Sequence, residues 1–199
     1  MDSLASHFRA MARNNAWAND RLLSACVALG REGFAARRTS FFPSLRATLN
    51  HNLWIDRYYL DALEQGGRGL GIGGPPDIAM PAALRTAQRD QDRRLVAFCD
   101  RLGPHDLSRR VDTDRGRPVP ERVDRLLAHL FQHQIHHRGQ AHAMLAGTGV
   151  APPQLDEFFL DYDRHPSVAA GGHLPDWPDL PHRPDLPDRE EAGAADAPR

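Results

Sequence analysis

The sequence predicts an all-α fold: an up-down four-helix bundle with a short β-hairpin between the third and fourth helices. Four long stretches carry apolar residues at the three- and four-residue spacing of a helix face. Connections that contain glycine or proline separate these stretches, as expected where helices end. With 199 residues, the chain can bury the core of one domain. We expect this domain at residues 1–163 and a proline-rich tail, extended or disordered, at residues 164–199.

The first two helices are predicted from residue 2 or 3 to 29 and from 44 to about 64. Ser3 and Ser44 can cap their N-termini, and Gly30 can end the first helix. Each helix has an apolar face that would lie in the core. The residues of these faces are Leu4, Phe8, Met11, Trp17, Leu22, Leu23, Cys26 and Val27 in the first helix, and Leu45, Leu49, Leu53, Leu60 and Leu63 in the second.

A glycine-rich connection, residues 65–76, precedes the third helix, which is predicted at residues 81–102. The connection contains Gly-Leu-Gly-Ile-Gly-Gly at 69–74, which formally matches the dinucleotide-binding pattern G-x-G-x-x-G. However, it follows a helix instead of a strand, and Pro75 and Pro76 stand where a phosphate-binding helix would begin. We therefore interpret the connection as a spacer, with a flexible lid as the alternative.

Residues 108–119 have the pattern of two short strands around an Asp-Arg-Gly turn. An isolated hairpin is not stable in water, so this one should pack against the helices. The fourth helix is predicted from residue 120 or 121 to Ala146, where glycines follow. Gly139 lies within it, at a cost of about 1 kcal/mol relative to alanine. Its presence favours a close approach of another helix, from this chain or from a second subunit.

A short C-terminal helix is predicted from Gln154 to about Asp161. Beyond it, proline recurs at every third position of residues 175–187, which is the repeat of polyproline II. Such a rod could bind an aromatic groove of a partner, but we favour a surface appendage. Residues 190–199 are expected to be disordered.

The composition excludes several classes of function. The net charge is −1, which argues against nucleic acid as a partner. All 25 basic residues are arginine, which excludes Schiff-base chemistry and P-loop phosphate binding, because both need lysine. Cys26 and Cys99 lack metal-binding or redox spacing and are interpreted as core thiols in a reducing cytoplasm. No apolar run approaches the roughly 20 residues of a membrane span, so we expect a cytoplasmic protein.

Four of the eleven histidines lie close together in the predicted fourth helix. His129, His133 and His137 are four residues apart and share one helix face, with His136 about 100° away. The outer two are roughly 12 Å apart along the axis, whereas a metal–nitrogen bond is only about 2.0–2.1 Å long. One ion can therefore bind a neighbouring pair and needs a further ligand from elsewhere. Gln134 replaces the glutamate of the zinc-protease motif His-Glu-x-x-His, which excludes that class.

The pattern His129-x3-His133-x3-His137-Arg138-Gly139-Gln140 resembles the signature of the DinB family, a family of metal-binding four-helix proteins. The resemblance covers about residues 1–162 and includes three shorter stretches, Asn14–Asn19, Thr48–Arg57 and Pro153–Asp156. In the family, the histidines that correspond to His133 and His137 bind the metal together with a third from an earlier helix. The resemblance implies that His51 is this third ligand. Helical periodicity alone leaves His51 as readily exposed as metal-binding.

The resemblance thus implies one divalent metal ion held by His51, His133 and His137. Three neutral imidazoles leave a coordination position open, which is typical of a catalytic site. With no thiolate ligand, zinc or nickel is favoured over iron or manganese. Because relatives in the family include thiol S-transferases, we expect a metal-dependent S-transferase or hydrolase, with metal-bound water or thiol as the nucleophile. Its partners would be a small-molecule thiol or electrophile and a second copy in a homodimer. The alternative is a non-catalytic, stress-related metal-binding or interaction protein.

Five further residues are candidates for contacts with the ligands or the substrate. His129 and His136 can hydrogen-bond to a ligand or relay protons, although a role in the core suits His129 at least as well. Arg138 and Gln140 can orient a substrate or brace the helices, and bracing or a dimer contact is favoured for Arg138. Asp56 can accept a hydrogen bond from a histidine N–H, but a surface charge is the favoured interpretation.

Overall fold

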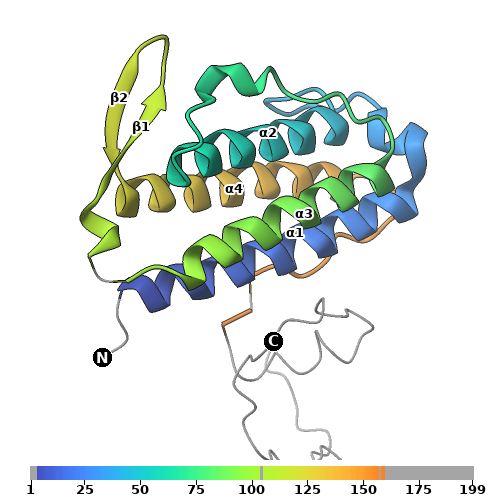
Figure 1. The fold of residues 1–199 in the computed structure, drawn as a ribbon. Helices are drawn as coiled ribbons and strands as arrows, with labels where there is room; N and C mark the ends of the chain where they lie inside the picture. Colours follow the sequence, from blue (N-terminus) through green and yellow to red (C-terminus); the bar gives the residue numbers. More distant parts are fainter. Residues whose placement is uncertain (1–3, 104, 157, 160–199) are drawn as a thin grey trace, which may run out of the picture.

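The computed structural model describes residues 4–103, 105–156 and 158–159. Four long helices pack side by side, and a two-stranded antiparallel hairpin stands at one end (Figure 1). The elements are, in chain order, α1 (Leu4–Ala35), α2 (Leu45–Leu63), η1 (Gly69–Ile72), α3 (Pro81–Asp100), η2 (Asp106–Ser108), β1 (Arg110–Asp114), β2 (Pro118–Arg122) and α4 (Val123–Ala146). The expectation of a mainly helical chain with a hairpin between its third and fourth long helices is confirmed. None of the described helices has the length and hydropathy that crossing a membrane requires.

The helix ends follow from a few local residues, as predicted. The Ser44 side chain accepts a hydrogen bond from the Ala47 backbone N–H at 3.1 Å and so caps α2. Pro81 occupies the first turn of α3, where its missing N–H is not needed. Gly30, with a φ of 80°, interrupts the helical backbone of α1 at the expected place, and one further turn continues to Ala35.

The hairpin shifts the start of the fourth helix. Because β2 runs as far as Arg122, α4 begins later than predicted, at Val123. The hairpin is anchored to the helices in two ways. Val111 of β1 is buried in the core, and the Tyr58 hydroxyl of α2 donates a hydrogen bond to the backbone oxygen of Asp114. These contacts supply the packing that an isolated hairpin would lack.

The helices do not alternate in direction, so the predicted up-down order is wrong for α2 and α3. Both run from right to left in Figure 1, while α1 and α4 run the opposite way. The connection after α2 returns along that helix. Its residue Asp77 forms a salt bridge with Arg46, which lies near the start of α2. At the other end of α2, Glu64 pairs with Arg94 of α3, with 2.7 Å between Oε2 and Nη2. The connection is long enough to span the helix, so α3 starts at the same end as α2.

The core contains two large apolar clusters, one toward each end of the helices, besides a small one around Trp17. One cluster includes Phe8, Tyr59, Leu60, Leu95, Leu127 and Phe131. The other includes Leu22, Leu49, Leu53, Leu84, Met144 and Leu145. Most residues of the predicted apolar faces are in these clusters or packed against them, but Leu4 and Val27 are exposed.

In each long helix, buried polar residues lie between the two large apolar clusters. We call them the polar layer: Asn15, Asn19, Asp56, Gln88, Asp92, Gln134 and Arg138.

Arg138 joins α4 to α1 inside the polar layer. Its Nη1 donates hydrogen bonds to the side-chain oxygens of Asn15 and Asn19, the latter at 3.0 Å. Both asparagines in turn donate from Nδ2 to Asp92 Oδ1 of α3, at 3.2 Å and 3.0 Å. The arginine is 5% exposed, so it braces the helices from within, which is one of the two roles favoured from the sequence.

Asp56 enters the same layer from α2. Its side chain accepts hydrogen bonds from Gln88 Nε2 at 2.7 Å and from Gln134 Nε2 at 2.6 Å. The residue is 1% exposed, so its interpretation as a surface charge is wrong. The donors to its carboxyl are the side-chain amides of Gln88 and Gln134 and not a histidine N–H, which corrects the alternative interpretation of Asp56. A buried carboxylate needs donors in place of water, and the two glutamines provide them.

The segment after α4 is not helical where the structure describes it. Residues 154–156, 158 and 159 form bends, turns and irregular backbone, so the short helix predicted there is wrong for these residues. Phe158 is buried against Trp17 of α1, with ring centroids 5.4 Å apart. The apolar residues of the segment thus cover α1 without forming a helix, and Trp17 belongs to the core, as predicted. The proline-rich tail, residues 164–199, lies outside the described residues.

Gly139 lies on an exposed face of α4. A Cβ added there would meet no atom within 4 Å. No other helix in the described part of the chain therefore approaches Gly139 closely, which contradicts one of the two explanations for a glycine at this position. The other explanation, contact with a second subunit, stays a prediction.

Candidate metal centre

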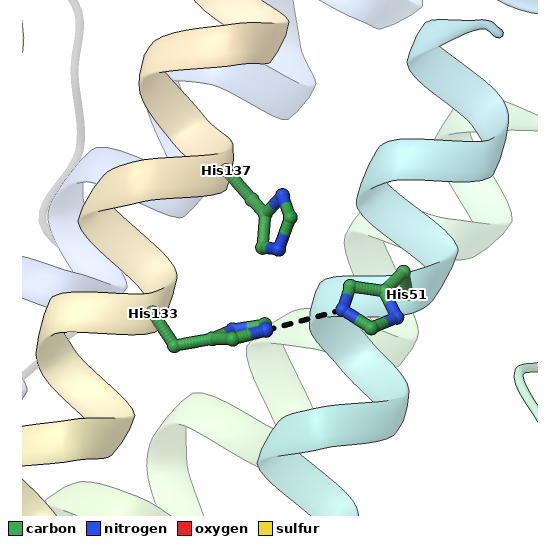
Figure 2. Close-up of side chains that lie close together, drawn as sticks. All are labelled: His51, His133 and His137. Carbon is green, nitrogen blue, oxygen red and sulfur yellow. Dashed lines mark hydrogen bonds between the residues drawn. The ribbon is translucent and has the colours of Figure 1, made fainter. Parts of the chain in front are cut away.

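Three histidines from two helices meet beside the α2–α4 interface. His51 projects from α2, and His133 and His137 project from successive turns of α4 (Figure 2). One ring nitrogen from each residue lies within 4.8 Å of the other two. The Nε2 atoms of His51 and His133 are 3.1 Å apart. The structure therefore brings together the three residues that the sequence analysis singled out as ligands.

The register of α2 against α4 places these rings opposite one another. Gln134, next to His133, donates from Nε2 to the backbone oxygen of Asn52, next to His51, at 3.1 Å. The same amide donates to Asp56 in the polar layer. These bonds fix how far one helix is displaced along the other. The polar layer thus holds α2 and α4 in the register that brings His51 opposite His133.

The histidine rings are held in the neutral form that a metal ion requires. Burial, and secondly the charge of neighbouring histidines, lowers the pKa of His51 to about 4 and that of His133 to about 3. Burial also lowers the pKa of His137. Metal ligation needs a deprotonated ring nitrogen with a free lone pair. At neutral pH all three rings meet this condition.

Gln140 orients the His137 ring. The Nδ1–H of His137 donates to Gln140 Oε1 at 2.8 Å, because the amide oxygen can only accept. The proton therefore lies on Nδ1, and Nε2 keeps its lone pair for a metal ion. The other end of the amide donates from Nε2 to His136 Nε2 at 3.0 Å. The structure thus places Gln140 in contact with His137, whereas the roles named for it from the sequence, orienting a substrate or bracing the helices, stay predictions.

His129 and His136 lie outside the three-nitrogen group. Both are exposed, so a core position for His129 is wrong. Its ring packs edge-on against Tyr59, with centroids 5.3 Å apart, and lies 6.2 Å from the ring of His133. One further turn of α4 carries His129 away from the level of His51. His136 is connected to the group through Gln140.

Three aromatic residues border the histidine group and were not predicted from the sequence as part of it. The Phe42 ring lies 4.6 Å from that of His51 and 5.4 Å from that of His137, centroid to centroid. Phe41 packs edge-on against Phe42 at 4.9 Å. Trp54 lies 6.0 Å from His51. The only signal in the sequence was the pair Phe41-Phe42 just outside a helix, beside the cap of α2.

The spacing of the three nitrogens fits one first-row metal ion. Two nitrogens bound to a tetrahedral ion at about 2.0–2.1 Å are about 3.3 Å apart. The 3.1 Å between the Nε2 atoms of His51 and His133 is close to this value. The other separations reach at most 4.8 Å. The group can therefore hold a metal ion.

A comparison with models of protein families finds the DinB family over residues 2–165. The chain belongs to the DinB family. The matched region contains all three histidines and all the described residues, and it confirms the resemblance seen in the sequence. A comparison with curated proteins found no significant match. Membership of this metal-binding family and the convergence of three histidine nitrogens are both compatible with the binding of a metal ion at this place.

Replacing Gln140 by leucine in the DinB-family protein should weaken metal binding by about 10–100-fold. This is the usual effect of removing a residue that hydrogen-bonds to a metal-binding histidine. The His137 ring would lose the acceptor that fixes its proton on Nδ1. The dissociation constant for Zn²⁺ can be measured by competition with a chromophoric chelator. Gln132→Leu is the matched control, because Gln132 is an exposed glutamine of the same helix. Equal affinities of the two variants would contradict this role of Gln140.

Proposed function

We propose that this protein binds one divalent metal ion, zinc or nickel, through His51, His133 and His137 and acts as a metal-dependent thiol S-transferase. The observation that carries the proposal is the convergence of three neutral imidazoles from two helices. Three protein ligands leave at least one coordination position for an outside molecule. A structural site would be closed by a fourth protein ligand, whereas an open position is the arrangement of a catalytic site.

A bound divalent ion would lower the pKa of a thiol or water molecule in its open position toward neutrality. The residues of the chain would hold this position in place. His51, His133 and His137 would provide the ligands, Gln140 would fix the orientation of His137, and Phe42 would shield two of the rings from water. In the transfer, the thiol sulfur forms a bond to an electrophilic carbon. The leaving group departs with its electron pair, and the thiol proton passes to solvent.

Incubation of the metal-loaded protein with small thiols and electrophilic acceptors tests this proposal. We expect consumption of the thiol and formation of the thioether, and we expect a chelator to abolish both and added Zn²⁺ or Ni²⁺ to restore them. A rate that is the same for the loaded and the chelated protein would refute the metal-dependent mechanism. Metal binding without turnover across a broad panel would refute the transferase.

A non-catalytic interaction protein is the second candidate, and a groove on another face favours it. The groove has a volume of about 750 Å³ and is open to solvent between α1, α4 and the segment after α4. Its lining includes the exposed side chains of Ile135 and Phe159 and the open face of Gly139.

We propose that a second copy of the chain covers this groove in a homodimer. Sedimentation velocity of the full chain tests it, and a monomer at micromolar concentration would contradict it.

A further inference from the structure

Phe41 is the most exposed large apolar side chain in the part of the chain that the structure describes, at 77%. It lies in the connection between α1 and α2, directly beside the histidine group. Its ring centroid is 6.2 Å from that of His137 and 4.9 Å from that of Phe42. A single exposed apolar residue is common on a protein surface, but Phe41 continues into the ring of Phe42, and contiguous exposed apolar groups mark binding sites.

Phe41 belongs to a border of three rings, which we call the aromatic rim: Phe41, Phe42 and Trp54. Phe42 lies against both His51 and His137. Trp54 lies on α2 near His51 and donates from Nε1 to the backbone oxygen of Gly73 at 2.5 Å, which holds its indole in place. His51 thus stands between two aromatic side chains. An outside molecule bound to the same ion as His51 and His137 would lie next to this rim.

The chemistry of the rim selects for flat apolar groups. Aromatic rings prefer offset-stacked or edge-to-face partners with centroids 4.5–7 Å apart, roughly the separations already present among these side chains. A phenyl-like ring carried by the outside molecule could extend this arrangement by packing on Phe41, and it would remove the exposed face of Phe41 from water. A small polar molecule would gain nothing from the rim.

We propose that the aromatic rim binds a flat, aryl or benzyl-type group of the molecule that occupies the open coordination position. This inference rests on the metal site of the proposed function, but it does not depend on thiol chemistry. It assigns to Phe41 a role in specificity: the residue would contact the aryl ring of the bound molecule and is not itself a metal ligand. The substrate class of the site is then aryl-bearing molecules, as the thiol or as the electrophile.

A pair of matched metal-binding probes tests the inference. Acetohydroxamate and benzohydroxamate carry the same chelating group and differ in the phenyl ring. We expect the zinc-loaded protein to bind benzohydroxamate at least about tenfold more tightly by calorimetry, the ratio that one additional aromatic contact supports. In Phe41→Ala the ratio should fall toward one, while the affinity for acetohydroxamate and the zinc content stay unchanged. Phe159→Ala is the matched control, because Phe159 is also exposed and lies in the segment after α4.

The outcomes separate this inference from the proposed function. Equal binding of both probes to the zinc-loaded protein would overturn the role of the rim and leave the metal site intact. A preference for benzohydroxamate that survives in both Phe41→Ala and Phe41→Ala/Trp54→Ala would also overturn it. Failure of the zinc-loaded protein to bind either probe would overturn the open coordination position and, with it, the inference. Circular dichroism of each variant establishes that it is folded.

Discussion

Replacing Arg138 by methionine is expected to destabilise the protein by about 3–5 kcal/mol, the usual result when one partner of a buried charge network is removed. Methionine keeps much of the length of the side chain but loses the donors to Asn15 and Asn19. It also leaves the buried carboxyl groups of Asp56 and Asp92 without the cation that favours their charged forms. Urea unfolding in the presence of a chelator measures the change in the free energy of unfolding without a contribution from metal.

The control for this variant is Arg93→Met. Arg93 pairs with Asp90 on the exposed face of α3, and such surface pairs contribute about 0–1 kcal/mol. The prediction would be contradicted if Arg138→Met changed the free energy of unfolding as little as Arg93→Met does. In that case the polar layer would not depend on its arginine.

The Arg138→Met effect should also depend on pH. Burial raises the pKa of Asp56 and of Asp92 in the folded protein, and Arg138 opposes both shifts. A carboxyl whose pKa is raised on folding binds more protons in the folded state, so stability from this group falls as the pH rises above the unfolded pKa. Without Arg138 the shifts should be larger. The destabilisation should therefore be greater at pH 8 than at pH 5, and the opposite order would contradict this explanation.

Replacing His133 by alanine should reduce metal affinity by more than about 100-fold. Loss of a residue that only hydrogen-bonds to a metal ligand costs about 10–100-fold, and His133 would itself be a ligand. His133 provides the nitrogen that faces His51 at 3.1 Å, and its loss leaves two imidazoles on different helices. Metal analysis after dialysis should find about one ion per chain in the unmodified protein and none in the variant. His129→Ala is the control, because His129 is an exposed histidine one turn away on the same helix. Full occupancy in His133→Ala would refute its role as a ligand.

Local residues made the helices predictable, but not their directions. The cap at Ser44, the break at Gly30 and the position of Pro81 act over a few residues, so they can be recognised in the sequence. The parallel course of α2 and α3 involves instead contacts between residues far apart in the sequence, such as the hydrogen bond from the Ile78 backbone N–H to Asn50 Oδ1 at 2.9 Å. Apolar periodicity shows which face of a helix is buried and contains no information on the path of a long connection.

The candidate site was predictable in part for the same reason. The four-residue spacing places His133 and His137 on one face of a helix, whatever the tertiary structure. His51 was identified through the resemblance to the DinB family, because its own helix does not show which way it points. Asp56 was a candidate, but its burial was not predicted, and the aromatic rim was missed. A polar residue within a helix is usually exposed, and Phe41 lies outside any regular element.

X-ray absorption spectroscopy of the zinc-loaded protein tests most directly whether imidazoles from both helices hold one ion. We expect about three imidazole nitrogens at about 2.0–2.1 Å from the ion, together with an oxygen ligand from solvent. In His51→Ala the number of imidazoles should fall by one. An unchanged coordination shell in His51→Ala would contradict the convergence of α2 and α4 on a single metal ion.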